Sequence, residues 1–301
     1  MIPYYEKWVT RFPTLEKLAE TPLEEVLKYW AGLGYYRRVK MLHQAAQYLV
    51  HEYNGKIPDT PDELLKIPGI GRYTAGAIVS IAFNKKAALV DGNVIRILTR
   101  LYAIKQDIGS AATIQKIWTL AETLVPESQP GDFNQAMMEL GATVCLPTNP
   151  ACLLCPVSTE CRARAKGHPE NFPVKEKKEK MERITTAGLV LKNRLNHVLI
   201  QKQPSAARWG GLWMFPFDKN LQALQTKLGL RISERKPSFI VRHSFTKYRI
   251  DLRVYVADDD HPPSTRHHSL YQHKWVPVHD LKNYAFPSPH QKIIKELLAH
   301  G

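Results

Sequence analysis

All four cysteines of the 301-residue sequence lie in one short segment, at Cys145, Cys152, Cys155 and Cys161. A disulfide framework would spread its cysteines along the chain, whereas clustered thiols are typical of a metal or cluster site. Zinc sites usually pair two C-x2-C units across a longer insert, but here a single C-x2-C is flanked by two intermediate loops. The spacing therefore favours a [4Fe-4S] cluster, with one thiolate on each iron, and leaves zinc as the alternative.

A second segment with possible chemistry is Leu65–Gly76, LKIPGIGRYTAG, in which Gly69 and Gly71 separate two helical patterns. Glycine lets backbone amides approach a phosphate closely. The helix that follows offers unpaired N–H groups and the positive end of its dipole to an anion. The segment predicts a helix-hairpin-helix over about residues 60–83, which would hold a DNA backbone without reading its sequence. A plain helical corner of the core is the alternative.

Asp91 follows the apolar run AALV and precedes the helical pattern VIRILTRLYAI. Aspartate is common at helix starts, where its side chain caps backbone N–H groups, and base rates favour that structural role alone. Beside a DNA groove, the same carboxylate would stabilise the positive charge of an oxocarbenium ion as a glycosidic bond breaks. Both roles stay open from the residues themselves.

The elements that must position these residues fall into two classes. Helical periodicity runs from Tyr4 to about Ala165. Residues 168–183 are charge-dense and contain proline, which is typical of an interdomain linker. Period-two patterns then dominate until a closing helix. We therefore predict a helical domain over 1–167, the linker, and a small α+β domain over 184–301.

The charge of the chain points to a polyanionic partner. Its 42 Lys and Arg against 28 Asp and Glu give a net charge of +14. Residues 171–301 hold 23 basic and 11 acidic side chains, so nearly all of the excess lies there. Such a balance is typical of nucleic-acid binding. No apolar run has the length of a membrane span and the first residues lack a secretory signal, so we expect an intracellular protein with no membrane partner.

The order of these motifs resembles a known superfamily. PGIGRYTAG, then VDGNV, then FNQAMMELGATVC leading into the cysteines, is similar to the endonuclease III superfamily of DNA glycosylases. GLGYYRR and FNQAMMELGA resemble its MutY family of adenine DNA glycosylases. The resemblance runs from Ile2 to the C-terminus. It implies an all-α helix-hairpin-helix glycosylase domain with an iron-sulfur cluster loop, followed by a small α+β Nudix-like domain.

The resemblance also implies a function. The chain would act in base excision repair as a monofunctional hydrolase. It would cleave the N-glycosidic bond of adenine mispaired with 8-oxoguanine or guanine. It would work as a monomer on double-stranded DNA, in the cytoplasm or nucleoid if the source is bacterial, and would carry a [4Fe-4S] cluster on its four cysteines.

Individual residues take roles from the resemblance. Asp91 would be the catalytic aspartate, and Asn93 would help to organise its site. Tyr73 stands where bifunctional lyases carry a Schiff-base lysine, so hydrolysis by water without β-elimination is expected. Tyr35 matches an aromatic residue that wedges into the base stack beside the lesion, with a core position as the alternative. The DNA backbone would be contacted at the hairpin by Pro68, Gly69, Gly71 and Arg72.

The C-terminal part is similar to the Nudix-related domain that recognises 8-oxoguanine, with Trp209–Pro216 as the best local match. A Nudix hydrolase needs a Glu-rich helix for its metal, and Lys219–Leu224 has no carboxylate, so pyrophosphate hydrolysis is not expected. The loop that probes the lesion is Phe-Ser-His in the family and Phe245, Thr246 and Lys247 here. Threonine keeps a hydroxyl donor, while lysine replaces an imidazole with a point charge.

One segment of the family pattern has no counterpart in these 301 residues. The family's general acid is a glutamate in a Ser-Glu helix followed by Leu-Gln-Gln, just upstream of the segment that matches Ile2–Tyr5. We expect either a misassigned start or a truncated paralogue, and we read Glu6 as a surface residue. Two other functions stay open: a mispair-binding protein impaired in catalysis, and a thymine-glycol-type DNA glycosylase, which Tyr73 disfavours.

Overall fold

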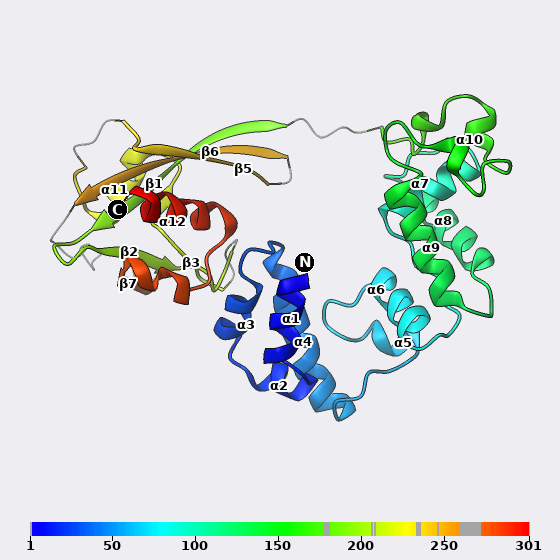
Figure 1. Cartoon of the computed structure of the whole chain (residues 1–301), viewed down its shortest axis with the longest axis horizontal. Coiled ribbons are helices and arrows are strands. Elements are labelled where there is room, and N and C mark those ends of the chain that lie inside the picture. The colour runs from blue at the N-terminus through cyan, green and yellow to red at the C-terminus, as the bar shows by residue number, and fades with distance from the viewer. Residues whose placement is uncertain are drawn as a thin grey trace. The chain divides into compact units, whose positions relative to one another are not determined.

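The computed structural model describes residues 2–176, 181–205, 207, 209–232, 236–245, 247–258 and 272–300. Contacts divide the chain into two compact units (Figure 1). The central unit is Tyr48–Lys178, and the split unit joins Met1–Gln47 to Glu179–Gly301. Across the described residues, no helix has the length and apolar character needed to cross a membrane.

The central unit is helical throughout the part that the structure describes. Its elements are α5 (Pro61–Leu64), α6 (Arg72–Ala77), the π-helical turn η1 (Ile78–Ala82), α7 (Gly92–Leu101), α8 (Ala111–Leu124), α9 (Pro130–Thr143), the 3-10 turns η2 (Cys152–Leu154) and η3 (Pro169–Asn171), and α10 (Arg162–Ala165). Buried side chains recur at helical spacing, as at Val94, Ile97 and Leu98 of α7. Val94 and Leu98 pack against Ile117 and Trp118 of α8 in one core.

A buried polar link fixes α9 against η1. Asn134 Nδ2 donates to Ser80 Oγ and to the Ala87 carbonyl oxygen, both at 2.9 Å. Buried amides are costly unless bonded, so these contacts hold the two elements in one register. Ala87 begins the extended segment that leads to α7, and the same link therefore positions the start of α7.

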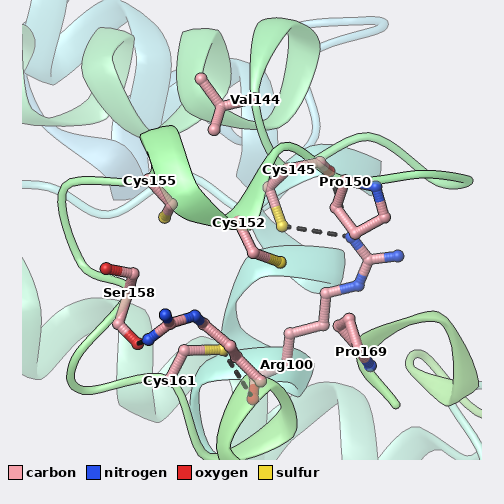
Figure 2. Close-up of a pocket in the computed structure, with 10 residues that line it drawn as sticks. Arg100, Val144, Cys145, Pro150, Cys152, Cys155, Ser158, Cys161 and Pro169 are labelled. Carbon is pink, nitrogen blue, oxygen red and sulfur yellow. Dashed lines mark hydrogen bonds between the residues drawn. The ribbon is translucent and has the colours of Figure 1, made fainter. Parts of the chain in front are cut away.

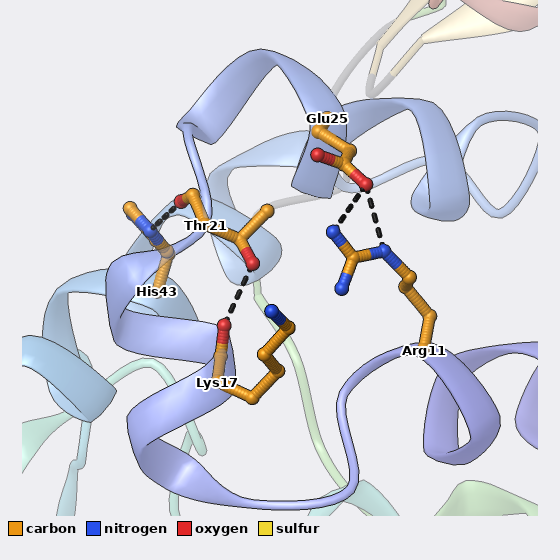
Figure 3. Close-up of polar contacts among 5 residues, drawn as sticks. All are labelled: Arg11, Lys17, Thr21, Glu25 and His43. Atoms are coloured by element: carbon orange, nitrogen blue, oxygen red, sulfur yellow. Dashed lines mark hydrogen bonds and ion pairs between the residues drawn. The ribbon is translucent and has the colours of Figure 1, made fainter.

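The split unit begins with α1 (Ile2–Arg11), α2 (Leu15–Glu20), α3 (Leu23–Trp30) and α4 (Tyr36–Tyr53), the last of which runs on into the central unit. Figure 3 shows the polar contacts that hold them together. Arg11 Nε donates to Glu25 Oε1 at 2.7 Å, which ties α1 to α3. His43 Nε2 on α4 lies 2.9 Å from the carbonyl oxygen of Thr21, the residue between α2 and α3.

In its described residues, the rest of the split unit is a seven-stranded mixed sheet with three helices. The strands are β1 (Glu182–Lys192), β2 (His197–Lys202), β3 (Trp213–Met214), β4 (Phe217–Asp218), β5 (Phe239–Phe245), β6 (Tyr248–Asp258) and β7 (Gln272–Pro277); the helices are α11 (Leu221–Leu228), the 3-10 helix η5 (Val278–Asn283) and α12 (Ser288–His300). The main order is β3-β2-β1-β6-β5, with β4 on β1 and β7 on β2. β1 and β6 run parallel, and the other pairs are antiparallel.

The two longer helices cover opposite faces of this sheet. Ile293 of α12 packs with Val190 and Val254 on one face, while Leu224 of α11 packs with Leu189 on the other. Because successive strand residues point to opposite faces, both sides of β1 are apolar. The structure thus combines a helical part with a mixed α+β part, as the predicted fold class requires.

The N-terminal helices share a core with the end of the chain. Leu27 of α3 packs with Leu212 and Ala285. Glu24 Oε1 accepts from Trp213 Nε1 at 2.9 Å, and Glu24 Oε2 pairs with Lys202 Nζ at 2.6 Å. These contacts explain why the compact units differ from the domains predicted over 1–167 and 184–301. The domain boundaries themselves remain a prediction.

Part of the predicted linker packs on the central unit. Phe172 is buried and its carbonyl oxygen accepts from Arg100 Nε at 3.1 Å. The Val174 carbonyl oxygen accepts from the Ile108 amide at 3.0 Å. Residues 168–174 therefore continue the fold of the central unit, and β1 begins eight residues later at Glu182.

Candidate functional site

Asp91 is fixed at the start of α7. It is the N-cap residue, and its Oδ1 accepts from the Val94 amide at 2.8 Å. Its Oδ2 accepts from Asn93 Nδ2 at 3.1 Å. The two residues before it, Leu89 and Val90, are buried. Both carboxylate oxygens of Asp91 therefore accept hydrogen bonds from residues at the start of α7. The helix-capping role predicted from the sequence is present.

Asn93 is in turn held by Arg96, one turn further along α7. Arg96 Nη2 donates to Asn93 Oδ1 and to the Gly141 carbonyl oxygen, both at 2.7 Å. Arg96 Nε donates to the Cys145 carbonyl oxygen at 2.7 Å. One side chain thus links the partner of Asp91 to the end of α9 and to the first cysteine.

Gly141 allows α9 to lie against the start of α7. A Cβ at this position would come within 2.5 Å of Asn93 Cβ, which is well inside an ordinary contact. Only a residue without a side chain leaves room for Asn93 to reach Asp91 while α9 packs this closely. The motif FNQAMMELGA therefore has a steric reason for its glycine.

Arg100 organises the cysteine loop from the last turn of α7 (Figure 2). It is 2% exposed, and Nη1 lies 3.3 Å from Cys145 Sγ. It also donates to the carbonyl oxygens of Cys145, Leu146, Pro147 and Phe172. The planar guanidinium suits such a set of acceptors, and it brings positive charge next to a thiol.

The four cysteines converge on one hollow, together with Arg100 (Figure 2). Burial raises the pKa of the Cys152 thiol, and the neighbouring Cys161, Cys145 and Cys155 raise it further, since charges of one sign oppose each other at short range. Among the residues that the structure describes, no three His, Cys, Asp or Glu side chains stand close enough together to hold a single metal ion.

The predicted hairpin forms between α5 and α6. Gly69 has φ +81°, a conformation that favours glycine, and the Ile70 amide closes the turn by donating to the Ile67 carbonyl oxygen at 3.1 Å. Gly71 is the N-cap of α6, and no side chain caps that helix in this described region. The turn that carries Pro68 therefore presents backbone amides at a helix start.

Arg72 and Tyr73, the first residues of α6, contact other helices. The Arg72 guanidinium lies 4.0 Å from the centre of the Trp118 ring and pairs with Glu122 at 2.7 Å. The sequence predicts Arg72 as a DNA contact; in the structure its side chain packs on α8. Tyr73 is partly exposed, and its hydroxyl donates to Met138 Sδ of α9 at 3.7 Å.

The remaining predicted site residues belong to the split unit. Tyr35 lies in the loop before α4, 81% exposed and with φ +47°, so it is not a core aromatic residue. Phe245 ends β5 opposite Tyr248, and Thr246 lies outside the described residues. Lys247 Nζ pairs with Glu182 at 2.7 Å, and this hydrogen bond raises the lysine pKa.

Two site residues escape prediction from the sequence, Arg96 and Arg100. Both lie four apart on α7, in the otherwise apolar pattern VIRILTRLY. Arginines at that spacing share one helix face, and this face must pack in a small helical domain. The four-residue spacing of the two arginines would have predicted buried hydrogen bonds from this face of α7. It would not have predicted which groups accept them.

Comparisons with known proteins agree with this geometry. Residues 1–123 match the family described as HhH-GPD superfamily base excision DNA repair protein, and residues 186–296 match a NUDIX domain. The adenine DNA glycosylase of Buchnera aphidicola subsp. Acyrthosiphon pisum (strain APS) is 31% identical over 301 residues, covering 98% of this chain and 84% of that protein. The chain belongs to the adenine DNA glycosylase family.

One further relative and one solved structure are also similar to this chain. The human adenine DNA glycosylase is 50% identical over 173 residues, 57% of this chain. The matched part covers 32% of the length of the human protein. Among solved structures, a thermostable thymine-DNA glycosylase is similar with a TM-score of 0.50 and 32% identity, over 55% of this chain and 76% of that one. The helical half is thus a glycosylase fold.

Proposed function

We propose that the chain is a DNA glycosylase that hydrolyses the N-glycosidic bond of adenine mispaired with 8-oxoguanine or guanine, in base excision repair. The observation that carries this proposal is the fixed carboxylate of Asp91. It follows the helix-hairpin-helix in a member of the adenine DNA glycosylase family. A charge held in advance needs no reorganisation when the opposite charge develops on a sugar, which makes it an effective catalyst.

Asp91 and Tyr73 would together determine the type of reaction. The Asp91 carboxylate would stabilise the oxocarbenium ion that forms as the C–N bond to adenine breaks. Water would then bond to the sugar carbon through its oxygen, and in the overall reaction one of its protons goes to the departing adenine. Tyr73 has no amine with which to form a Schiff base, so its position supports hydrolysis without strand cleavage. Asn93 and Arg96 would keep Asp91 in place through the hydrogen bonds described above.

DNA would be held in both units. The amides around Gly69 and Gly71 suit a phosphate at the hairpin. In the split unit, the exposed Tyr35 would wedge into the base stack. Thr246, which lies outside the described residues, and Lys247 would probe the base opposite adenine. The positive charge of residues 171–301 supports backbone binding by the same unit.

We also propose that Cys145, Cys152, Cys155 and Cys161 hold a [4Fe-4S] cluster. Four thiols around one hollow suit a cofactor in which each thiolate bonds a different iron. The bound cluster would supply four metal–sulfur bonds that clamp residues 145–161 into one shape. Arg100 would place its charge beside the Cys145 thiolate and would hold the loop's carbonyl oxygens.

Single-turnover excision from a duplex containing adenine opposite 8-oxoguanine tests the function, comparing the chain with Asp91→Asn. Asparagine caps a helix about as well as aspartate, but its amide nitrogen cannot accept from Asn93 Nδ2, so the free energy of unfolding should fall by about 0.5–1.5 kcal/mol. Loss of the charge should slow excision by roughly 10²- to 10³-fold, as removal of one preorganised group does. Asp107→Asn is the matched control, because Asp107 caps the Gly109 amide in an exposed turn.

The outcome also separates the alternatives. Excision that does not depend on Asp91 would refute the proposed mechanism. Tight binding of the mispair without excision, in the chain and in its Asp107→Asn control alike, would favour the mispair-binding protein. Release of thymine glycol faster than adenine would favour the thymine-glycol-type enzyme.

A further inference from the structure

The loop between α3 and α4, residues 31–35, has a backbone conformation that few sequences adopt. Gly32 and Gly34 have φ +102° and +73°, and Tyr35 has φ +47°. Glycine adopts such angles readily, but a tyrosine keeps them only where its surroundings enforce them. The Tyr35 side chain is 81% exposed, so it contributes little to holding itself in place. Other groups must therefore fix the shape of this loop.

Two side chains at the ends of the loop supply these contacts. Trp30 Nε1 donates to the Gly34 carbonyl oxygen at 2.8 Å, and Tyr36 Oη accepts from the Gly32 amide at 3.2 Å. Both rings pack in the apolar core that the first four helices share with Leu212. Packing in that core therefore determines the path of the loop.

The Tyr36 hydroxyl also reaches the other end of the chain. It donates to the Phe286 carbonyl oxygen at 3.1 Å, across 250 residues of sequence. Gln291 Nε2 of α12 donates to the same oxygen at 3.1 Å, which fixes the acceptor. Tyr36 is 6% exposed and Phe286 is 1% exposed, so water has little access to this bond. One hydroxyl, acting as donor and acceptor, thus bridges the loop to the segment before α12.

Gly32 lies against two other helices of the same compact unit. A Cβ at this position would come within 2.9 Å of Tyr4 Oη on α1 and within 3.6 Å of Gln291 Oε1 on α12. The first of these distances is shorter than an ordinary contact, so the loop has no room for a side chain here. The place of the loop therefore depends on α12 as well as on α1.

Insertion of a ring between stacked bases is favoured when the ring is already in place before the duplex arrives. Ordering a side chain and its loop only on binding weakens association. We propose that Tyr36 is a positioning residue, whose hydroxyl bridges Gly32 to Phe286 and thereby holds the Tyr35 ring where it enters the base stack. This inference rests on the proposed DNA glycosylase function. It makes insertion depend on the C-terminal segment as well as on the helices beside Tyr35.

Binding of the full chain to a duplex that resists excision tests this role. The duplex carries 2′-fluoro-2′-deoxyadenosine, whose fluorine opposes oxocarbenium formation, opposite 8-oxoguanine, with 2-aminopurine as the neighbouring base. Unstacking raises the fluorescence of 2-aminopurine and so reports insertion, while the anisotropy of an end label gives Kd. Tyr36→Phe should weaken binding by about three- to tenfold, the factor that one hydrogen bond contributes, and should reduce the rise in fluorescence. Tyr29→Phe is the matched control, because Tyr29 packs on the same core, and it should match the parent.

A double-mutant cycle separates positioning from a merely structural role. In a Tyr35→Ala background, Tyr36→Phe should change Kd by less than about twofold, because no ring is left to position. Trp30→Phe removes the other bond to the loop and should show the same dependence on Tyr35. This second variant decides the question if urea unfolding shows that Tyr36→Phe has lost its fold. Equal weakening of binding in both backgrounds, or binding as tight as that of the parent in both variants, would overturn the proposal.

Excision of adenine from the cleavable duplex, measured on the same preparations, separates this inference from the proposed function. If the parent excises adenine while Tyr36→Phe binds the mispair as tightly as the parent does, the positioning role is wrong and the function stands. If the parent neither excises adenine nor prefers the mispair to a matched duplex, the function is wrong and the inference fails with it.

Discussion

Replacing Gly141 by alanine tests the claim that close packing positions the carboxylate of Asp91, which we propose to be catalytic. The new Cβ would lie 2.5 Å from Asn93 Cβ, against at least 3.4 Å for an ordinary contact. The start of α7 and the end of α9 must therefore separate by about 0.9 Å. That shift stretches the Arg96 bond to the Gly141 carbonyl oxygen, now 2.7 Å, and moves Asn93 away from Asp91.

Two magnitudes decide what Gly141→Ala should do. Overpacking costs about 1–3 kcal/mol, and the gain in helix propensity of alanine over glycine offsets about 1 kcal/mol. The free energy of unfolding should therefore fall by only about 0–2 kcal/mol. Excision should suffer far more, because a displacement of about 1 Å at a reacting group costs roughly 100-fold.

The assay measures both quantities on the same preparations. Single-turnover excision gives the rate of the chemical step, urea unfolding gives stability, and iron content shows whether the cysteine loop is intact. Ala142→Ser adds one heavy atom at the neighbouring exposed position of α9 and should match the parent in all three. A Gly141→Ala protein that excises adenine within threefold of the parent would refute the steric argument.

Two further predictions concern buried nitrogen-rich side chains. Arg100→Leu leaves the buried carbonyl oxygens of the cysteine loop without their donor, at about 1–3 kcal/mol for each unpaired group; urea unfolding should show a loss of at least about 3 kcal/mol, and a loss below about 1 kcal/mol would contradict the assigned role. Burial lowers the pKa of His290 to about 3, so it binds no proton in the folded chain above that pH, but the unfolded chain binds one below about pH 6.5. Stability should therefore fall as pH is lowered from 6.5 toward 3, by roughly 1 kcal/mol per pH unit from this residue. His290→Gln should show a slope shallower by that amount, and equal slopes would show that the pKa of His290 is not depressed.

Local patterns in the sequence predict most of the elements. Apolar spacing in VIRILTRLY and the alternation in YRIDLRVYVAD reflect burial on one helix face and on a sheet, and both elements form where expected. The helix start at Asp91 is equally local, because a cap needs only the three residues that follow it. The convergence of four cysteines within seventeen residues is local as well.

Long-range pairings are what the sequence leaves open. Arg72 follows a glycine turn that suits a phosphate, and its contact with Trp118 depends on the packing of α8, 46 residues away. The link from Arg96 to Cys145 spans 49 residues in the same way. The contact of Leu27 with Leu212, the residue before β3, joins α3 to a segment that sequence periodicity places in another domain. Such contacts depend on which apolar face of one helix or strand packs against which apolar face of another. The same pattern of apolar residues in the sequence is compatible with many of these pairings.

The joining of the two chain ends into one core has a consequence for the order of events during synthesis. Leu27 and Tyr36 leave the ribosome early, but their partners Leu212 and Phe286 follow only after the whole central unit has been made. At about 5–20 residues per second, the roughly 130 residues between Gln47 and Glu182 take on the order of ten seconds. The central unit can close in that interval, since the contacts that define it lie between residues 48 and 178. The first four helices must wait with apolar side chains uncovered, so this chain is most vulnerable to aggregation while its N-terminal segment is finished and its last strands are still unmade.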